Sequence, residues 1–250
     1  MNVTFTATAT SFQTLLVSAP HADVSVRADD ITEAIIEITG PEDIVRQADA
    51  VVAAGIWTLN LPDTPASTFT TSGGNMRVGT NRGVVIQASR VSGDLFFGGG
   101  GSVTFNGDVR ISQPEPVTVA IRIPRGTQLI TRMRSGDLST AGELGSVDHT
   151  GASGQVRIAH ARDIVAETAS GDVIVRQVET VATIRTASGD VRVDGGTRID
   201  VQAASGDVHF AATADCVLFA RTASGDIQIR RFGHQVNANT RTASGDVRDS

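Results

Sequence analysis

Aspartates and serines recur together in a Ser-Gly-Asp motif through the second half of the chain, and their chemistry is considered first. The serines stand at intervals of 17 to 20 residues: Ser135, Ser153, Ser170, Ser188, Ser205, Ser224 and Ser244. Carboxylates in the glycine-rich turns of a repeat protein can bind calcium if several oxygens converge in each turn. Each copy offers one carboxylate, and Gln155 replaces it in the second copy. We therefore expect the aspartates to bond the backbone of their turns, and we predict no metal site.

Nucleophilic and metal-assisted catalysis would need partner residues that the sequence does not supply. The repeated serines lie outside any Gly-x-Ser-x-Gly elbow, and no histidine keeps a fixed distance from them. The five histidines share no metal-ligand spacing: His21, His149, His160, His209 and His234. A single cysteine, Cys216, excludes an internal disulfide and a zinc finger. The sequence predicts a protein that is not an enzyme; the alternative is a carbohydrate-active β-helix enzyme with acids clustered on one rung face.

Four consecutive glycines, Gly98–Gly101, have the composition of a phosphate-binding loop. Such a loop needs a helix N-terminus directly behind the glycines, because the backbone N–H groups of the helix hold the phosphate. The residues that follow, Ser-Val-Thr-Phe at 102–105, have the composition of a strand instead. We expect a turn here and predict no cofactor.

Composition and charge limit the kinds of partner. The chain has 250 residues, a net charge of −6 and a pI near 5.3, with no run of basic residues. Nucleic acid is not an expected partner, because phosphate binding needs clustered lysine and arginine. No apolar run reaches the roughly 18 residues that could cross a bilayer. Residues 1–6 lack the basic and apolar regions of a signal peptide, so the chain as written is expected to be cytoplasmic, with a surface location only if a signal is missing from it.

The residues around the motif alternate between apolar and polar, which is the pattern of half-buried strands. Apolar residues prevail six and four positions before each serine and three and five positions after it. Threonines such as Thr168 and Thr186 share the inward side. Each repeat therefore holds two strands joined by a Ser-Gly-Asp corner, where glycine supplies a positive φ. We predict structural turns at Ser135, Gly136, Asp137, Ser170, Gly171, Asp172, Ser188, Gly189, Asp190, Ser205, Gly206, Asp207, Ser224, Gly225 and Asp226.

A period near 20 residues predicts a solenoid, in which stacked repeats bury a shared core. The predicted fold is all-β: a single-stranded parallel β-helix, or β-solenoid, with a β-rich N-terminal region. The crossover rule favours a right-handed coil, although short rungs also occur in left-handed helices. We assign residues 66–250 to the solenoid and expect regular rungs from about residue 129. Degenerate early repeats are expected at residues 71–76, 91–95 and 105–109.

Residues 1–65 form the expected N-terminal region, a β-rich lead-in or cap. Three strands are expected, at residues 12–17, 22–28 and 34–39. A hairpin is expected at residues 51–61. Residues 41–48 read as one short helix, because proline suits the first helical position and two acids follow in the first turn.

The repeat varies in length at one place, the connection between the second strand of one rung and the first strand of the next. Insertions in solenoids map to loops on one side, which is often the binding side. The longest connection gives a candidate interaction loop with Arg230, Arg231, Phe232 and His234, whose protein or glycan partner is left open. The last copy, residues 242–250, has no obvious capping helix. Its unpaired backbone groups suggest self-association through the C-terminal rung.

The Ser-Gly-Asp-Val/Ile copies from Ser135 to Ser244, preceded by Ile-Arg-Ile-Pro-Arg-Gly at 121–126, resemble the bacterial putative-adhesin family, a β-strand-repeat domain of unknown function. The resemblance covers residues 100–250 and, more loosely, the lead-in. It implies a β-repeat fold and supplies no catalytic residues to carry over, and many members are exported or membrane-linked. It favours a non-catalytic binding or scaffold protein of the adhesin type, with a self-associating structural protein as a further alternative.

Overall fold

The computed structural model describes residues 1–63, 68–72, 76–79, 85–88, 102–105, 108–112 and 116–250. The chain forms two compact units. One unit combines residues 1–63 with residues 116–250, and the other holds residues 64–115. The sequence suggested a boundary near residue 65 between a lead-in and a solenoid. The lead-in instead belongs to the same unit as the regular repeats, and the segment that follows it is the separate part.

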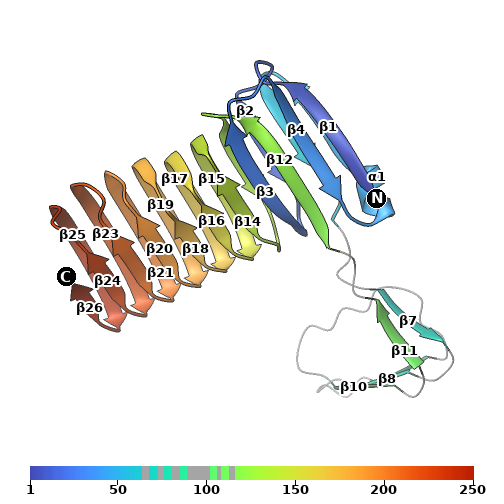
Figure 1. The fold of residues 1–250 in the computed structure, drawn as a ribbon. Coiled ribbons are helices and arrows are strands. Elements are labelled where there is room, and N and C mark those ends of the chain that lie inside the picture. Colours follow the sequence, from blue (N-terminus) through green and yellow to red (C-terminus); the bar gives the residue numbers. More distant parts are fainter. Residues whose placement is uncertain (64–67, 73–75, 80–84, 89–101, 106–107, 113–115) are drawn as a thin grey trace. The chain divides into compact units, whose positions relative to one another are not determined.

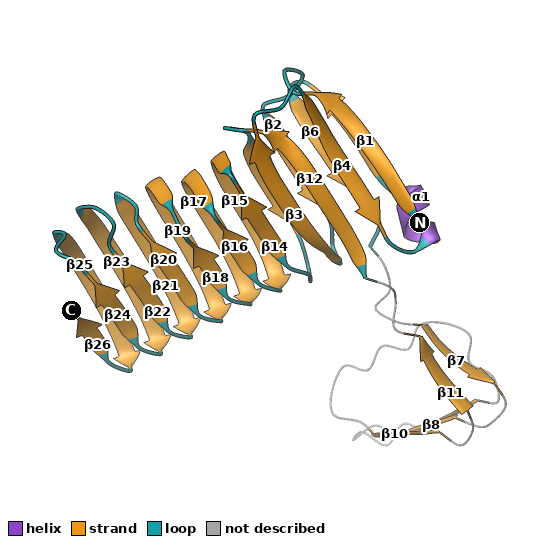
Figure 2. Ribbon diagram, viewed as in Figure 1, coloured by secondary structure: helices purple, strands orange, loops and turns teal. Residues whose placement is uncertain are grey.

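The larger unit is built from two sheets (Figures 1 and 2). The eleven-stranded sheet contains, in spatial order, β1 (Asn2–Thr8), β4 (Glu33–Thr39), β12 (Val117–Pro124), β3 (Ala22–Asp29), β14 (Leu138–Ala141), β16 (Val156–Ile158), β18 (Val173–Val175), β20 (Val191–Asp194), β22 (Val208–Ala211), β24 (Ile227–Arg230) and β26 (Val247–Asp249). The ten-stranded sheet contains β25 (Val236–Ser244), β23 (Cys216–Ser224), β21 (Arg198–Ser205), β19 (Val178–Ser188), β17 (His160–Ser170), β15 (Glu143–Ser153), β13 (Gln128–Arg132), β2 (Thr14–Ser18), β6 (Ile56–Asn60) and β5 (Asp49–Ala53).

Successive repeats stack as parallel strands, which confirms the predicted β-solenoid; the pairing of β17 with β19 shifts register between Ala161 and Asp163. Ser170 lies opposite Ser188, and Ser188 lies opposite Ser205, so each corner stacks on the previous one. Each rung contributes a long strand to the ten-stranded sheet and a short strand to the eleven-stranded sheet, as Figure 1 shows for β17 and β18. The handedness of the coil stays a prediction.

The N-terminal strands are part of the solenoid sheets. β3 lies between β12 and β14 and pairs with both in parallel, with Val24 opposite Val119 and Leu138. β2 lies between β13 and β6 in the other sheet. The expected strands, hairpin and short helix are present, with α1 spanning Glu42–Gln47. β1, which pairs antiparallel with β4, was not anticipated from the sequence.

The unit of residues 64–115 differs from the early solenoid repeats that the sequence suggested. Its described strands pair antiparallel, β7 (Thr68–Ser72) with β11 (Asp108–Ser112), and β8 (Met76–Gly79) with both β9 (Val85–Ala88) and β10 (Ser102–Phe105). The expected repeat at residues 91–95 and the glycine turn at 98–101 lie outside the described residues. In the sequence the motifs of this segment lack a constant spacing, whereas stacked rungs need equivalent residues opposite each other.

The core lies between the two sheets and follows the alternation seen in the sequence. Six positions before the corner serine stand Leu129, Val147, Ile164, Ala182, Ile199 and Leu218, which are all buried. Three positions after it stand Leu138, Val156, Val173, Val191, Val208 and Ile227, which are also buried. The threonines Thr168, Thr186 and Thr222 face inward near the corners, as predicted. At the N-terminal end of the unit, Phe12 packs against Trp57 with ring centroids 5.2 Å apart.

Candidate functional site

The Ser-Gly-Asp corners form a hydrogen-bonded ladder along one edge of the solenoid. The backbone N–H of Asp207 donates to Asp190 Oδ1 at 2.9 Å, and that of Asp226 donates to Asp207 Oδ1 at 2.8 Å. Gln155, which lacks a carboxylate, still donates its N–H to Asp137 Oδ1 at 2.8 Å. One oxygen of these carboxylates is thus engaged with the next rung, and the motif acts in stacking.

Glycine is required at the corners because each one lies against the backbone of the previous rung. Gly171 has φ +143°, and a Cβ on it would meet the carbonyl oxygen of Gly154 at 1.9 Å. Gly189 has φ +133°, and its Cβ would meet the carbonyl oxygen of Gly171 at 2.4 Å. The most recognisable residues of the sequence therefore hold the rungs together.

The loop that the sequence nominated for interaction divides into residues with different surroundings. Arg231 forms a paired contact with Asp249, Nε to Oδ1 at 2.6 Å and Nη2 to Oδ2 at 2.5 Å, and donates from Nη1 to the carbonyl of Val236 at 2.6 Å. The hydrogen bond from Arg231 lowers the pKa of the Asp249 carboxyl. Phe232 is 70% exposed, and His234 Nδ1 lies 3.9 Å from Asp215. Arg231 thus ties the last strand to its neighbour, while Phe232 projects from the loop.

Arg230 belongs to a different surface, the outward face of the eleven-stranded sheet. Along β24 the side chains of Ile227 and Ile229 are buried, so Gln228 and Arg230 point outward. Strand pairing places Arg192, His209 and Gln228 in one outward row and Asp194, Ala211 and Arg230 in the next. These residues line a hollow of 180 Å³ across β20, β22 and β24.

This hollow across β20, β22 and β24, called the smaller hollow below, is lined by two cations, one carboxylate and two further polar side chains. Arg192 Nε lies 3.4 Å from Asp194 Oδ1, a distance at which the charges attract. That contact is not a hydrogen bond, and Asp194 Oδ1 is a buried oxygen without a hydrogen-bond partner among the described residues. His209 Nδ1 and Gln228 Oε1 lie 3.1 Å apart. Asp194 therefore keeps one carboxylate oxygen buried beside the Arg192 guanidinium, where the open hollow does not reach it.

A larger hollow of 480 Å³ opens on the same face, across β4, β12, β3 and β14. Small outward residues lie in its middle: Ser25, Ala120, Ser139 and Ala141. Arg27, Arg122 and Glu37 also line it, and both arginines contact Asp29. The hydrogen bond from Arg27 is the main cause that lowers the pKa of Asp29. Because Ser25, Ala120 and Ser139 are far apart in the sequence, no local pattern predicted this hollow.

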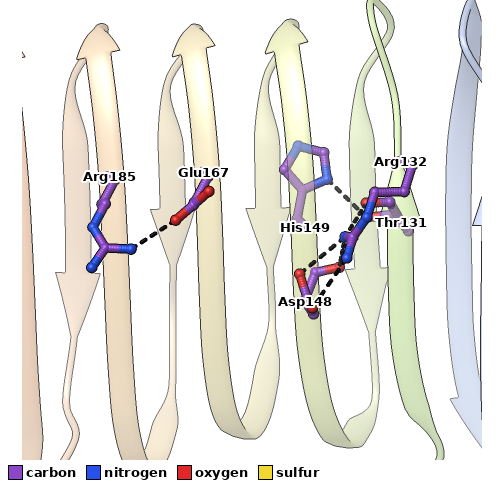
Figure 3. Close-up of polar contacts among 6 residues, drawn as sticks. All are labelled: Thr131, Arg132, Asp148, His149, Glu167 and Arg185. Carbon is purple, nitrogen blue, oxygen red and sulfur yellow. Dashed lines mark hydrogen bonds and ion pairs between the residues drawn. The ribbon is translucent and has the colours of Figure 1, made fainter.

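The outward face of the ten-stranded sheet carries charges that pair with each other (Figure 3). Arg132 Nη1 lies 3.0 Å from Asp148 Oδ1, and Arg185 Nη1 lies 2.7 Å from Glu167 Oε1. These pairs cross from one rung to the next and neutralise each other on the surface.

Beneath that face lies a buried histidine. His149 is 3% exposed, and its Nδ1 lies 2.8 Å from Thr131 Oγ1, as Figure 3 shows. Burial lowers the pKa of His149 to about 4. Across the described residues no group of three or more His, Cys, Asp or Glu side chains is placed to hold a metal ion. His149 is thus an isolated titratable group in the core.

The free thiol of Cys216 is buried, and burial is the main cause that raises its pKa. A raised pKa keeps the thiol protonated and poorly nucleophilic. In the described part of the chain, none of the helices has the length and apolar composition to cross a membrane. Neither the buried Cys216 thiol nor the helices of the described residues add a candidate site to the two hollows.

Comparisons with known proteins identify a family. A family model described as Toastrack DUF4097 matches residues 64–250, which confirms the kind of family that the Ser-Gly-Asp repeats suggested. In a comparison with curated proteins, none matches the chain.

Solved structures show a distant likeness over the whole chain. A putative adhesin from Bacteroides fragilis is 11% identical with a TM-score of 0.48, and the match covers 100% of this chain and 97% of that one. A putative lipid binding protein from Parabacteroides distasonis is 14% identical with a TM-score of 0.47, covering 100% and 94%. A putative adhesin from the same organism is 9% identical with a TM-score of 0.48, covering 100% and 97%. No residue role is carried over from these proteins.

Proposed function

The chain belongs to the Toastrack DUF4097 family, and we propose that it is a non-catalytic binding scaffold of the adhesin type. Its recognition surface in this proposal is the outward face of the eleven-stranded sheet. The observation that carries the proposal is that both described hollows, of 480 and 180 Å³, open on this one face. Ligand sites are concave and combine apolar lining with a few polar groups. The larger hollow has that composition, and the smaller one is lined mostly by charged and polar side chains.

A stacked sheet suits a recognition surface because it fixes side chains on a regular lattice. Neighbouring strands are about 4.8 Å apart, and outward residues along one strand alternate with buried ones. The strand pairing in register therefore sets the spacing of Arg192, His209 and Gln228 without any loop. Sites built on rigid elements need little ordering when a ligand binds.

The carboxylates in the two hollows support binding without catalysis. Glycoside hydrolysis normally uses two carboxyl groups on either side of the scissile bond. Glu37 is the acidic residue that lines the larger hollow, and Asp194 is the acidic residue that lines the smaller one. A single carboxylate in each hollow does not match that arrangement, and this favours the scaffold over the carbohydrate-active enzyme.

The test is a glycan and cell-wall-polymer array probed with the intact chain and two matched variants. Ala120→Trp places a large side chain in the middle of the larger hollow, on the outward side of β12. Val165→Trp, on the outward side of β17, is the control on the other sheet. We expect ligands bound by the wild type to be lost in Ala120→Trp, or in the equivalent Ala211→Trp in the smaller hollow, and kept in Val165→Trp.

The proposal fails if the bound ligands survive both hollow-filling changes, or if Val165→Trp removes them equally. Circular dichroism of each variant checks that the fold is intact. Turnover of any bound glycan into shorter products would overturn the non-catalytic part of the proposal.

Self-association through the C-terminal rung is a second proposal with its own observation. β25 and β26 are the last strands of their sheets, and Val247 on β26 is 45% exposed although its counterparts in earlier rungs are buried. A second copy pairing along these strands would bury Val247. Sedimentation at tens of micromolar should then give more than the mass of one chain, and a mass of one chain contradicts this proposal.

A further inference from the structure

The strand β1 is an open edge of the eleven-stranded sheet. It pairs with β4 alone, antiparallel and without a break in register, and none of the described residues pairs with its other side. Proteins usually protect such an edge with charged side chains, proline or a bulge, because its unpaired backbone groups can bind another strand. The sequence of β1, Asn-Val-Thr-Phe-Thr-Ala-Thr, has no charge and no proline. This edge is therefore unprotected.

The hydrogen bonds at the start of β1 show which backbone groups face the open side. The amino group of Met1 donates to the carbonyl of Gly40 at 2.7 Å, and the N–H of Gly40 donates to the carbonyl of Met1 at 3.1 Å. In an antiparallel ladder every second residue directs its N–H and C=O toward the same neighbouring strand. The odd-numbered residues of β1 therefore bond β4. Thr4 and Thr6 direct their N–H and C=O groups toward the open side.

Behind this edge the end of the core is incompletely covered. The inward residues of β4 are fully buried, whereas those of β1 pack on the core but stay partly exposed: Val3, Phe5 and Ala7. In the other sheet the edge strand is β5, where Val52 is 38% exposed although its neighbour Trp57 on the same side is buried. The helix α1 lies at the Asn2 end of β1 (Figure 1). A strand added to β1 would cover apolar surface that α1 leaves exposed.

The sequence of β1 is complementary to a second copy of itself. Antiparallel pairing about a two-fold axis at Phe5 would use the whole strand and place Thr4 opposite Thr6 of the partner subunit. This register joins the residues whose N–H and C=O groups are open, and it opposes no like charges because the strand has none. Phe5 would meet its own counterpart on the core side. Aromatic pairs and threonine pairs across neighbouring strands both stabilise a sheet.

We propose that the outer edge of β1 is an interface at which two copies of this chain pair antiparallel, centred on Phe5. The two eleven-stranded sheets then continue into each other. Each copy uses the same edge, so the contact closes with two chains. The pairing does not depend on the proposed function.

The pairing would also bring two recognition surfaces together. β4, which lines the larger hollow, is the neighbour of β1, so the strand order across the interface is β4, β1, β1, β4. The two hollows would begin three strand spacings apart, about 14 Å. A ligand with repeated units that reaches both hollows would gain avidity. This consequence rests on the proposed function, whereas the pairing itself does not.

Charges placed on the edge test the pairing. Thr4 and Thr6 are exposed on the outward side, so changing them leaves the core intact. One variant combines Thr4→Lys with Thr6→Lys, and the other combines Thr4→Glu with Thr6→Glu. Sedimentation at tens of micromolar, on chains without an added N-terminal segment, should give the mass of two chains for the wild type. Each double variant alone should pair at least tenfold more weakly, because like charges oppose each other. A mixture of the two variants should regain the mass of two chains.

Hydrogen exchange locates the contact in the wild type. The amides of Thr4 and Thr6 should exchange more slowly as the protein concentration rises, because the second copy accepts their hydrogen bonds. Val247→Lys adds a lysine to the exposed edge strand β26 and is the matched control, which should leave the mass of two chains unchanged.

Three results would overturn the proposal. They are a wild-type mass of one chain, a dimer that persists in both double variants, and loss of the dimer in Val247→Lys alone, which assigns self-association to the C-terminal rung. The array separates this inference from the proposed function. A chain that pairs through β1 but binds no ligand leaves the pairing correct and the scaffold proposal wrong. A chain that stays single but loses its ligand in Ala120→Trp leaves the scaffold proposal correct and the pairing wrong.

Discussion

The two sheets share one core and one set of rungs, but their outward faces differ. On the ten-stranded sheet, strands such as β15, β17 and β19 are eleven residues long, and charges of opposite sign meet across neighbouring rungs. On the eleven-stranded sheet, the rung strands are three or four residues long, and small or unpaired residues leave two hollows. The ten-stranded face pairs Arg132 with Asp148 and Arg185 with Glu167 across rungs, whereas the eleven-stranded face contains the two hollows.

The difference follows from where the chain turns. The Ser-Gly-Asp corner directly precedes each short strand, and Asp carboxylates bond the next corner. The corner fixes the backbone of the short strands, so their outward side chains are not needed to hold register. We infer that these positions are open to recognition, while the long strands combine stacking with surface neutralisation.

The largest expected effect comes from breaking the corner that both faces share. Gly189→Ala forces a Cβ against the carbonyl oxygen of Gly171, 2.4 Å away, at φ +133°. We expect a loss of about 3 kcal/mol or more in the free energy of unfolding. Gly233→Ala is the control, because Gly233 has φ +85° but its Cβ would meet nothing within 4 Å. That change should cost about 1–2 kcal/mol. Urea denaturation measures both, and equal losses would show that close stacking at the corner is unimportant.

The second prediction concerns the core beneath the ten-stranded face. His149 has a folded pKa of about 4 against 6.5 for the free side chain. Between these values the unfolded chain binds more protons than the folded one, so stability is retained above pH 6.5 and is lost as pH falls toward 4. The full loss is about 3 kcal/mol, since one pKa unit corresponds to about 1.4 kcal/mol.

His149→Val tests this by introducing the residue that Val201 provides at the equivalent inward position of a later rung. Urea denaturation at pH 7 and at pH 4.5 measures how much unfolding free energy is lost between the two pH values. That loss should be smaller in His149→Val than in the wild type by on the order of 2 kcal/mol. Ile184→Val, in the same inward row, controls for the change in volume and should keep the wild-type difference. If His149→Val loses as much unfolding free energy between pH 7 and pH 4.5 as the wild type does, groups other than His149 cause the acid sensitivity.

Local patterns in the sequence predicted the rungs but not the faces. The alternation around Thr168 and the glycine at Gly171 depend on neighbouring residues, so they identified strands, inward side chains and corners. The position of β3 between β12 and β14 depends on pairing between residues far apart in the chain, and nothing near Ser25 encodes it. The same holds for the antiparallel unit of residues 64–115.

The candidate site shows the same limit. Loop-length variation led to Arg230 and Arg231 together, because they are adjacent in sequence. In the structure Arg231 holds Asp249, whereas Arg230 lies on an outward row with Asp194 and Ala211. The alternation within Ile227–Arg230 could have separated the two arginines, since it places Arg230 on the outward side of a strand. The position of Asp194, two strands away from Arg230 in the same row, could be predicted only from the register between rungs.

A smaller effect is expected from the paired charges of the ten-stranded face. Replacing both Arg185 and Glu167 by glutamine removes an exposed ion pair, and such pairs contribute about 0–1 kcal/mol. We expect the free energy of unfolding to change by less than about 0.5 kcal/mol, and the change to vanish in 0.5 M salt. A loss of several kcal/mol would mean that neutralisation on this face holds the rungs in register and that the corner is not sufficient.

The smallest effect should be local to the last rung. The backbone N–H of Arg231 donates to the carbonyl of Ser250, and the N–H of Ser250 donates to the carbonyl of Ile229, so exchange of these two amides reports on the pairing of β24 with the end of the chain. Arg231→Gln removes the paired contact with Asp249, and hydrogen exchange at both amides should accelerate while the global unfolding transition hardly moves.

The interaction with Arg231 lowers the pKa of Asp249, so in the wild type this protection should be present at neutral pH and be lost as acid protonates the carboxyl. Arg230→Gln is the matched control: if the two adjacent arginines serve different faces as the structure indicates, it should leave exchange at both amides unchanged, and equal acceleration in the two variants would contradict that division.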